Sequence, residues 1–196
     1  MYKNFVKPIF DRLFAVIILI PVTLFFFIPI SLIILLFDGG PVLYKGKRLG
    51  KNETVFPMYK FRTMKNNSKI ILNRDGSTFN SETDVRLTKT GKFLRETSID
   101  ELPQLLNILK GEMSFIGPRA SLESAKGSFK EDEIDKMKVK PGITGLTQAY
   151  YRNSLSTREK RLKDSWYGNH VSLILDVKIF FKTVVTVFKR ENIYSE

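Results

Sequence analysis

Apolar and polar positions divide the chain into two unequal parts. Residues 13–37 carry no charged side chain, and their only members outside the apolar set are Pro21, Thr23, Pro29 and Ser31. A helix of this length reaches about 37 Å at roughly 1.5 Å per residue, which is enough to cross the hydrocarbon core of a bilayer. The pattern predicts a membrane-inserted segment over residues 1–37 and a water-facing domain over residues 38–196.

Two features of this segment favour a re-entrant shape over a plain transmembrane helix. Pro21 and Pro29 lie inside the run, where each removes a backbone donor and clashes with the preceding turn. Basic residues also flank the run on both sides, and basic flanks tend to stay in the cytoplasm. These residues are Lys3, Lys7 and Arg12 before the run, and Lys45, Lys47, Arg48 and Lys51 after it.

We therefore predict a re-entrant helix-break-helix, in which the segment enters the membrane, breaks and returns to the same side. Pro21 is the first candidate for the break and Pro29 is the second. A spanning helix with proline kinks is the alternative, because bilayer proteins tolerate such kinks.

The rest of the chain alternates short apolar runs with turn signals. Residues 42–44 and 55–61 read as two strands joined through a turn at 50–52, which predicts a β-hairpin. Helical spacing begins at Thr90 and recurs over residues 102–109. The fold class predicted is mainly α with a small β-hairpin, an α+β arrangement.

Three polar or irregular stretches complete the pattern. Residues 65–83 are predicted to form a loop, the highly charged residues 128–140 a solvated helix, and residues 141–145 another loop. Near the C-terminus, six apolar residues share one helical face: Leu173, Ile174, Val177, Phe181, Val184 and Phe188. This amphipathic helix either packs on the core or lies in the membrane interface.

Composition limits the chemistry. The chain has no Cys and one His, which excludes disulfides, thiolate catalysis and a His-pair metal site. Its 32 Lys and Arg residues against 20 Asp and Glu give a net charge of +12. Such an excess indicates an anionic partner: a nucleic acid, acidic lipid headgroups or a phosphorylated substrate.

Candidate chemistry gathers around two adjacent acids, Asp100 and Glu101, at the start of an apolar helical run. A structural interpretation is available, since Ser98 and Glu101 fit a capping box, and Asp100 could itself be the N-cap. In a functional interpretation, a carboxylate holds Mg²⁺ that bridges phosphate oxygens, or attacks phosphorus to form an acyl phosphate.

Basic residues near turns or element ends strengthen the functional interpretation. Guanidinium groups suit the oxygens of a diphosphate, so we expect these residues to bind a phosphorylated substrate. The candidates are Lys60, Arg62, Arg86, Arg95 and Arg119.

Five stretches together resemble the bacterial sugar transferase family, the small monotopic phosphoglycosyl transferases. They are YKFRTM at 59–64, DVRLT at 84–88, LRETSIDELPQL at 94–105, LKGEMSFIGPR at 109–119 and PGITG at 141–145. Their order and spacing are highly specific, and the resemblance covers nearly the whole chain.

The resemblance implies transfer of a sugar 1-phosphate from a UDP-sugar to a polyprenol phosphate, usually undecaprenyl phosphate, with release of UMP. Asp100 would be the nucleophile that forms a covalent phospho-sugar intermediate, Glu101 would assist it, and Mg²⁺ would be held at Asp100. The substrate-binding residues implied are Lys60, Arg62, Arg86, Arg95, Pro118 and Arg119.

The family's architecture supports the re-entrant shape and adds amphipathic helices at the membrane interface. It implies the bacterial inner membrane, with the catalytic domain on the cytoplasmic face in contact with the lipid bilayer. A homodimer is compatible with the family, and no nucleic acid is expected.

This sequence departs from the family where sugar choice could be set. Ala120 replaces the usual Pro after Gly117-Pro118-Arg119, and residues 147–151 are unusual. The sugar therefore stays open. The competing interpretations are a membrane-anchored basic nucleic-acid-binding protein and an inactive scaffold, although the intact Asp100-Glu101 pair argues against the scaffold.

Overall fold

The computed structural model describes residues 1–73, 78, 79, 81 and 83–189. One long helix runs without interruption from Tyr2 to Asp38, and its length and composition would allow it to cross a membrane. It contains α1 (Lys7–Val22) and α2 (Ile28–Ile33). Wider π-helical turns lie before, between and after them, at Tyr2–Val6, Thr23–Phe27 and Ile34–Asp38.

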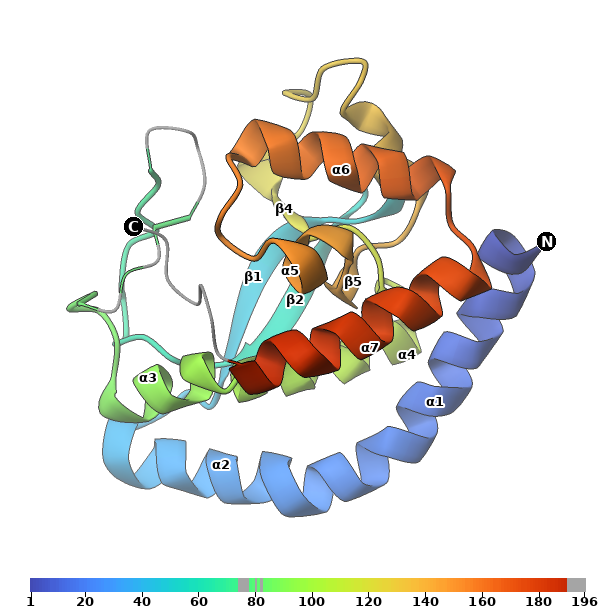
Figure 1. Ribbon diagram of the computed structural model, residues 1–196. Helices are drawn as coiled ribbons and strands as arrows, with labels where there is room; N and C mark the ends of the chain where they lie inside the picture. Colours follow the sequence, from blue (N-terminus) through green and yellow to red (C-terminus); the bar gives the residue numbers. More distant parts are fainter. Residues whose placement is uncertain (74–77, 80, 82, 190–196) are drawn as a thin grey trace.

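The long helix bends between α1 and α2, so that it wraps around one side of the molecule (Figure 1). The π-helical turn at the bend follows Pro21 and precedes Pro29, and Ile28 N–H closes it on the carbonyl of Thr23. Prolines and π-turns are the usual causes of helix kinks. The predicted break is therefore a bend in a continuous helix.

The N-terminal end of the long helix is bonded to the domain that follows this helix in the chain. Tyr2 Oη donates to Asp176 Oδ2 at 2.8 Å, and Lys7 Nζ lies 2.6 Å from the same oxygen. Lys3 Nζ donates to the carbonyl of Gly168 at 2.8 Å. These contacts join residues more than 160 positions apart, so this end of the helix is fixed.

The other end of the long helix is bonded to the same domain. Arg62 donates to the carbonyl oxygens of Asp38 (2.9 Å) and Gly39, and Thr88 Oγ1 donates to Asp38 Oδ2 at 2.9 Å. Both ends of the bent helix are therefore held by one domain.

The predicted hairpin is confirmed. Strand β1 (Leu43–Leu49) pairs antiparallel with β2 (Val55–Phe61), with a short 3-10 turn at Lys51–Glu53 between them. β4 (Ser121–Leu122) adds to the free edge of β1. The sequence predicts this strand only over residues 42–44, because the positions after them are polar. The strand continues to Leu49 because backbone pairing does not require apolar side chains.

A second, two-stranded sheet was not predicted. β3 (Ser114–Ile116) pairs in parallel with β5 (Gly142–Thr144), so the expected loop at 141–145 is largely a strand. The approach is very close at Gly145, where a Cβ atom would lie 2.0 Å from the carbonyl oxygen of Gly117. Glycine is required at this close approach. Its presence makes the segment look like a loop in the sequence.

The helices of the domain surround the hairpin. They are α3 (Lys89–Glu96), a 3-10 turn at Ile99–Gln104, α4 (Leu105–Lys110), α5 (Leu146–Tyr150), α6 (Thr157–Asn169) and α7 (Leu173–Lys189). Gly111 ends α4 in the left-handed conformation, with φ of +79°. Short 3-10 turns lie at Glu123–Ala125 and Ile134–Lys138.

The predicted solvated helix at 128–140 is wrong. Only the turn Ile134–Lys138 is helical, and the charged Glu133 and Lys136 are 2% and 5% exposed. Glu133 is paired with Arg158 at 2.6 Å and Arg161 at 3.4 Å on α6. Charges that are satisfied by distant partners look, in sequence, like a solvated surface.

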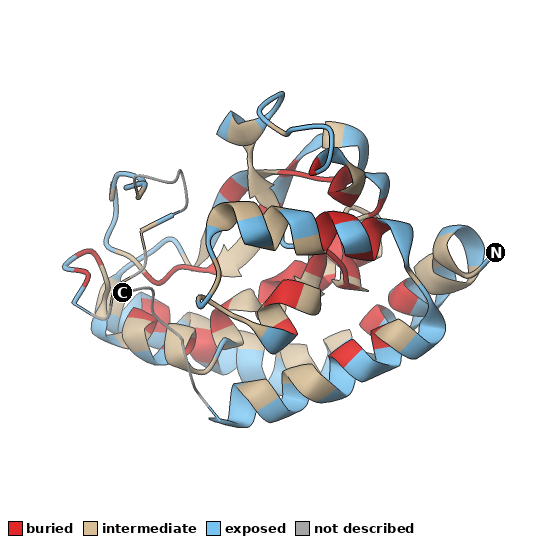
Figure 2. Cartoon of the chain, turned by 45° about the horizontal axis from the view of Figure 1, so that its top comes forward, coloured by how far each residue is buried: buried red, intermediate tan, exposed pale blue. Residues whose placement is uncertain are grey.

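One hydrophobic core lies between the hairpin, α1 and α4. Its buried members are Ala15, Phe56, Met58, Leu105, Ile108 and Met113. The outer side of the long helix is mostly exposed (Figure 2), although its residues are almost all apolar. The long helix thus uses one side as part of the core and leaves the other uncovered.

Helix α7 resolves the alternative left open for the C-terminal amphipathic segment. Asp176 and Ile179 are its buried residues, so the core lies on their side. The predicted apolar face is turned away from the core, and all six of its members are exposed: Leu173, Ile174, Val177, Phe181, Val184 and Phe188. Packing of that face on the core is excluded.

Candidate active site

The 3-10 turn at Ile99–Gln104 carries Asp100 and Glu101 and lies against β2. Ser98 precedes it in the left-handed conformation, with φ of +58°, and its side chain makes no capping bond. Neither capping interpretation is correct, because Asp100 lies inside the first turn rather than before it. The two acids are held by contacts from another part of the chain.

Lys60, near the end of β2, provides those contacts. Its Nζ lies 2.5 Å from Glu101 Oε1 and 3.5 Å from Asp100 Oδ2. All three side chains are largely buried. One buried ammonium therefore joins two carboxylates, an arrangement that is stable only if the remaining negative charge is balanced nearby.

The two carboxylates differ in their electrostatic surroundings. Burial raises the pKa of Asp100 above its ordinary value, against the opposing charges of Lys60 and Arg95. Burial also acts to raise the pKa of Glu101, but the charges of Lys60 and Arg119 outweigh it and lower that pKa. Glu101 is thus the ionised partner of Lys60, and Asp100 is the more basic carboxylate, a property suited to nucleophilic attack.

Arg119 approaches the pair from the segment between β3 and β4. Its Nη1 lies 4.0 Å from Glu101 Oε1, and 61% of its side chain is exposed. Pro118, beside it, is buried, and its carbonyl accepts a hydrogen bond from Gly142 N–H. The guanidinium of Arg119 can therefore contact both Glu101 and an incoming anion, while Pro118 supports the backbone.

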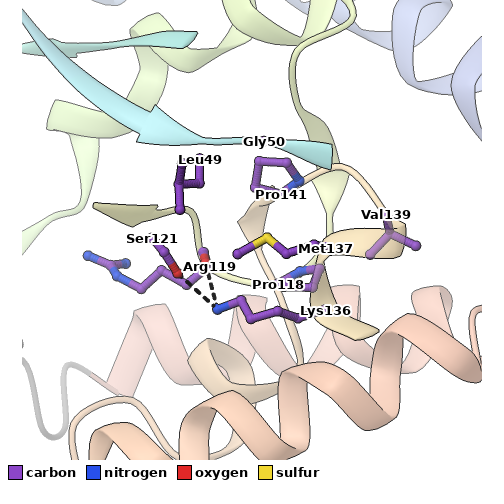
Figure 3. A pocket seen from close by; sticks show the side chains of 9 residues that line it. All are labelled: Leu49, Gly50, Pro118, Arg119, Ser121, Lys136, Met137, Val139 and Pro141. Atoms are coloured by element: carbon purple, nitrogen blue, oxygen red, sulfur yellow. Dashed lines mark hydrogen bonds between the residues drawn. The ribbon is translucent and has the colours of Figure 1, made fainter. Parts of the chain in front are cut away.

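The buried side chain of Lys136 holds the segment that carries Arg119, through the two hydrogen bonds drawn in Figure 3. Lys136 Nζ donates to the Arg119 carbonyl at 3.3 Å and to Ser121 Oγ at 3.2 Å, and it lies 3.4 Å from Asp164 Oδ2. Asp164 also accepts a bond from Thr147 Oγ1 at 2.9 Å. The backbone at Arg119 is therefore fixed relative to α6.

Arg95 on α3 is a further cation that acts on the pair. Its Nε donates to Thr63 Oγ1 at 3.0 Å, and its charge acts to lower the pKa of Asp100. Gly91 brings α3 this close, because a Cβ atom there would lie 2.0 Å from the carbonyl oxygen of Thr63. The close approach of α3 to the segment that follows β2 brings a third cation, Arg95, near Asp100.

Two predicted substrate-binding residues are not brought to the pair. Arg62 is 6% exposed and is engaged by the backbone of Asp38 and Gly39 and by Asn66 Oδ1 at 2.6 Å. Arg86 forms a two-pronged ion pair with Asp84, with contacts of 2.9 and 2.5 Å. Arg62 instead fixes the end of the long helix, and Arg86 stabilises its own loop.

Sequence reasoning missed two elements of the site. Arg48 on β1 helps to lower the pKa of Glu101, yet it was read only as part of a basic flank. Lys136 lies in the charged stretch that was predicted to be a solvated helix, and no ion-pair role was predicted for Asp164. The period-two alternation of β1 could have placed Arg48 on the same face as Tyr44, but no local pattern marks the buried ion pair.

The oxygens of Asp100 and Glu101 fit the way proteins bind Mg²⁺. This ion usually takes one or two carboxylates and completes its shell with substrate phosphates and water. No cluster of three or more His, Cys, Asp or Glu residues that could enclose a metal occurs within the described part of the chain. The pair is thus suited to a metal ion that arrives with a phosphorylated substrate.

The long apolar helix is consistent with membrane association, and guanidinium groups beside buried carboxylates are suited to phosphorylated ligands. Comparison with known protein families identifies one family that matches nearly the whole chain. The chain belongs to the bacterial sugar transferase family, whose model matches residues 2–190.

Three relatives show how much of the chain is shared. An undecaprenyl-phosphate galactose phosphotransferase of Salmonella typhimurium is 35% identical over 98% of this chain and 42% of its own length. A UDP-N-acetylgalactosamine-undecaprenyl-phosphate N-acetylgalactosaminephosphotransferase of Aeromonas hydrophila is 37% identical, over 93% and 44%. Exopolysaccharide production protein PSS of Rhizobium leguminosarum bv. phaseoli is 35% identical, over 93% of both chains. This chain thus spans less than half of the first two relatives and nearly all of the third.

Proposed function

We propose that this protein transfers a sugar 1-phosphate from a UDP-sugar to a polyprenol phosphate such as undecaprenyl phosphate, releasing UMP. The observation that carries the proposal is the Lys60-bound pair of Asp100 and Glu101. The family match and the names of the Salmonella and Aeromonas relatives, which both specify undecaprenyl phosphate, support it. Such a transfer would begin assembly of a surface glycan or glycoprotein oligosaccharide on its lipid carrier.

The proposed reaction consists of two displacements at one phosphorus. A carboxylate oxygen of Asp100 attacks the phosphorus that carries the sugar, the bond to the bridging oxygen breaks, and UMP leaves with that oxygen. Asp100 then holds the phospho-sugar as an acyl phosphate. An oxygen of the polyprenol phosphate attacks the same phosphorus, forms the lipid diphosphate and regenerates the carboxylate.

The neighbouring residues would act on charge and position. Lys60 favours the ionised form of Asp100, and Arg95 and Arg119 would balance the negative charge that develops on the transferred phosphoryl group. Glu101 holds Lys60 at 2.5 Å, which supports a positioning role. Asp100 would hold Mg²⁺ together with substrate phosphates, and the ion would neutralise part of their charge when bound.

We also propose that residues 1–37 enter the membrane and return to the side of residues 38–196. The support is the bend between α1 and α2 and the bonding of both helix ends to one domain. The exposed apolar face of α7 would lie in the same interface. Basic residues on both flanks support a cytoplasmic location for that side, and the proposed site is the bacterial inner membrane.

The function is tested by UMP release in detergent or nanodiscs, with undecaprenyl phosphate and a panel of UDP-sugars. We expect one or a few sugars to give stoichiometric UMP and lipid-linked sugar, and we expect chelation by EDTA to stop the reaction until Mg²⁺ is restored. Absence of UMP with every sugar would contradict the proposal. The alternative of nucleic-acid binding predicts instead a salt-sensitive complex with RNA or DNA.

The membrane arrangement is tested by cysteine labelling, for which the Cys-free chain gives a clean background. Cysteine is placed at the exposed positions Asn4, Phe25 and Lys45, one at a time. An impermeant maleimide is expected to label Asn4→Cys and Lys45→Cys only in inside-out vesicles, because both lie on the cytoplasmic side. Phe25→Cys at the bend should stay unlabelled in either orientation. Labelling of positions 4 and 45 from opposite sides would show a spanning helix.

A further inference from the structure

Arg48 lies on the same face of the hairpin as the lysine that holds the carboxylate pair. In the register of β1 and β2, Tyr44 is opposite Lys60, and Arg48 is opposite Phe56. Directly opposed residues share a face, and residues two or four positions apart along a strand share it too. Tyr44, Arg48 and Lys60 therefore belong to one face, whereas Lys47 belongs to the other.

Gly46 keeps this face open between Tyr44 and Arg48. A Cβ atom at position 46 would lie 2.8 Å from Cε1 of Tyr44 and 3.1 Å from its hydroxyl oxygen. The tyrosine ring thus lies directly over the glycine and points along the strand. Any larger residue at position 46 would displace the ring from its place beside Arg48.

The guanidinium of Arg48 has unused hydrogen-bonding capacity. Its Nε is buried, and it has no hydrogen-bond partner among the residues that the structure describes. Burial and the charge of Arg119 both lower the pKa of Arg48, against the opposite effect of Tyr44 and Glu101. A partly buried guanidinium beside another one is costly unless an anion neutralises them.

The negative charge already present does not suffice. Glu101 is the acid that acts on Arg48, but Lys60 lies 2.5 Å from it and Arg119 lies 4.0 Å from it. Lys60 also lies 3.5 Å from Asp100 Oδ2, so three cations are matched by two carboxylates here. Guanidinium groups can bind phosphate through two parallel hydrogen bonds, so the surplus positive charge of Arg48 and Arg119 is suited to a phosphate.

We propose that Arg48 and Arg119 together bind a substrate phosphate next to Asp100 and Glu101, with Tyr44 at the edge of this phosphate site. The inference rests on the proposed function, in which both substrates carry phosphate. The phosphate belongs either to the diphosphate of the sugar nucleotide or to the lipid acceptor, and the two half-reactions distinguish these sources.

The test compares Arg48→Gln and Arg48→Lys with Lys47→Gln in the full chain. Lys47 is the neighbouring cation on the opposite face, with 71% of its side chain exposed and a 3.5 Å contact to Glu123, so its loss should leave activity unchanged. We expect Arg48→Gln to lower kcat/KM about 10- to 100-fold, which is the usual effect of losing hydrogen bonds to a charged group. Arg48→Lys keeps the charge without the fork and should recover part of the activity.

The two half-reactions show which substrate's phosphate Arg48 binds. Release of UMP from the UDP-sugar alone reports the donor step, and transfer to added polyprenol phosphate reports the acceptor step. A defect in the first step places the donor's diphosphate at Arg48, and a defect confined to the second places the lipid phosphate there. Normal kinetics of both steps in Arg48→Gln would overturn the inference while leaving the proposed function intact.

Ligand binding gives a readout that does not depend on turnover. The thermal midpoint of each variant is measured without ligand, with UDP and with a short-chain polyprenol phosphate. We expect at least one ligand to stabilise the wild type and Lys47→Gln, and to stabilise Arg48→Gln much less. Equal stabilisation of all three would overturn the inference, and so would a wild type that neither ligand stabilises. Should Arg48→Gln fail to fold, the same comparison is made with Arg48→Lys.

Discussion

Replacement of Asp100 by Asn is expected to abolish transfer, with kcat lowered at least about 10³-fold. The amide has the shape of the carboxylate but cannot form the acyl phosphate with the phospho-sugar. The chain has no cysteine and a single histidine, so few side chains could take over the role. Stability should change little, because burial already raises the pKa of Asp100 and makes its negative charge unfavourable.

The measurement is UMP release from the UDP-sugar without a lipid acceptor, together with intact-protein mass spectrometry. Wild type should release one UMP per chain and gain the mass of the phospho-sugar, and Asp100→Asn should do neither. Asp132→Asn is the matched control, because Asp132 is exposed and paired with Arg158 on the surface. A phospho-sugar adduct on the Asp100→Asn protein would remove Asp100 from the role of nucleophile.

Replacement of Lys60 by Met is expected to lower kcat about 10²- to 10³-fold, the range seen when a preorganised electrostatic group is lost. Lys60 lies between Asp100 and Glu101, and its charge acts to lower the pKa of both acids. Without it, two buried carboxylates face each other and one of them takes up a proton. Asp100 is the acid whose pKa is already raised, so we expect Asp100 to take up that proton. The protonated carboxyl group no longer offers the negative oxygen that attacks phosphorus.

Lys60→Arg should restore a large part of the activity, since the positive charge is kept. The control is Lys45→Met, which removes an exposed cation from the other face of the same hairpin. Thermal unfolding of each variant shows whether the domain is intact. Should Lys60→Met retain wild-type kcat with a normal thermal midpoint, the cation would be structural and not part of the reaction.

Much of the fold follows from local patterns. The hairpin, α3, α4 and α7 all lie where strand or helix patterns indicated, because β2, α4 and α7 carry apolar residues at the period of their element. The motif resemblance singled out Asp100 and Glu101, and the structure brings Lys60 and Arg119 to them. These residues are far apart in sequence, so residue chemistry could suggest the group, and the resemblance gave each member its expected role.

The failures share one physical cause, which is that a local pattern does not reveal a distant partner. Ser98 and Glu101 fit a capping box, but Lys60 binds the glutamate instead. Arg62 carries a guanidinium group that could bind phosphate, yet its partners are the backbone carbonyls at the end of the long helix. Lys136 reads as surface because Asp164, which neutralises it, is 28 residues away.

The bent helix bonded at both ends has a consequence for the choice of membrane. In the proposed arrangement, the uncharged residues that precede the bend, 13–22, reach about 15 Å, which is about half of the roughly 30 Å of a hydrocarbon core. The protein would therefore occupy a single leaflet. Hydrophobic mismatch, which sorts spanning helices among bilayers of different thickness, would not act on it. Lipid packing and charge in that one leaflet would set its affinity for the membrane and the height of Asp100 above the lipid phosphates.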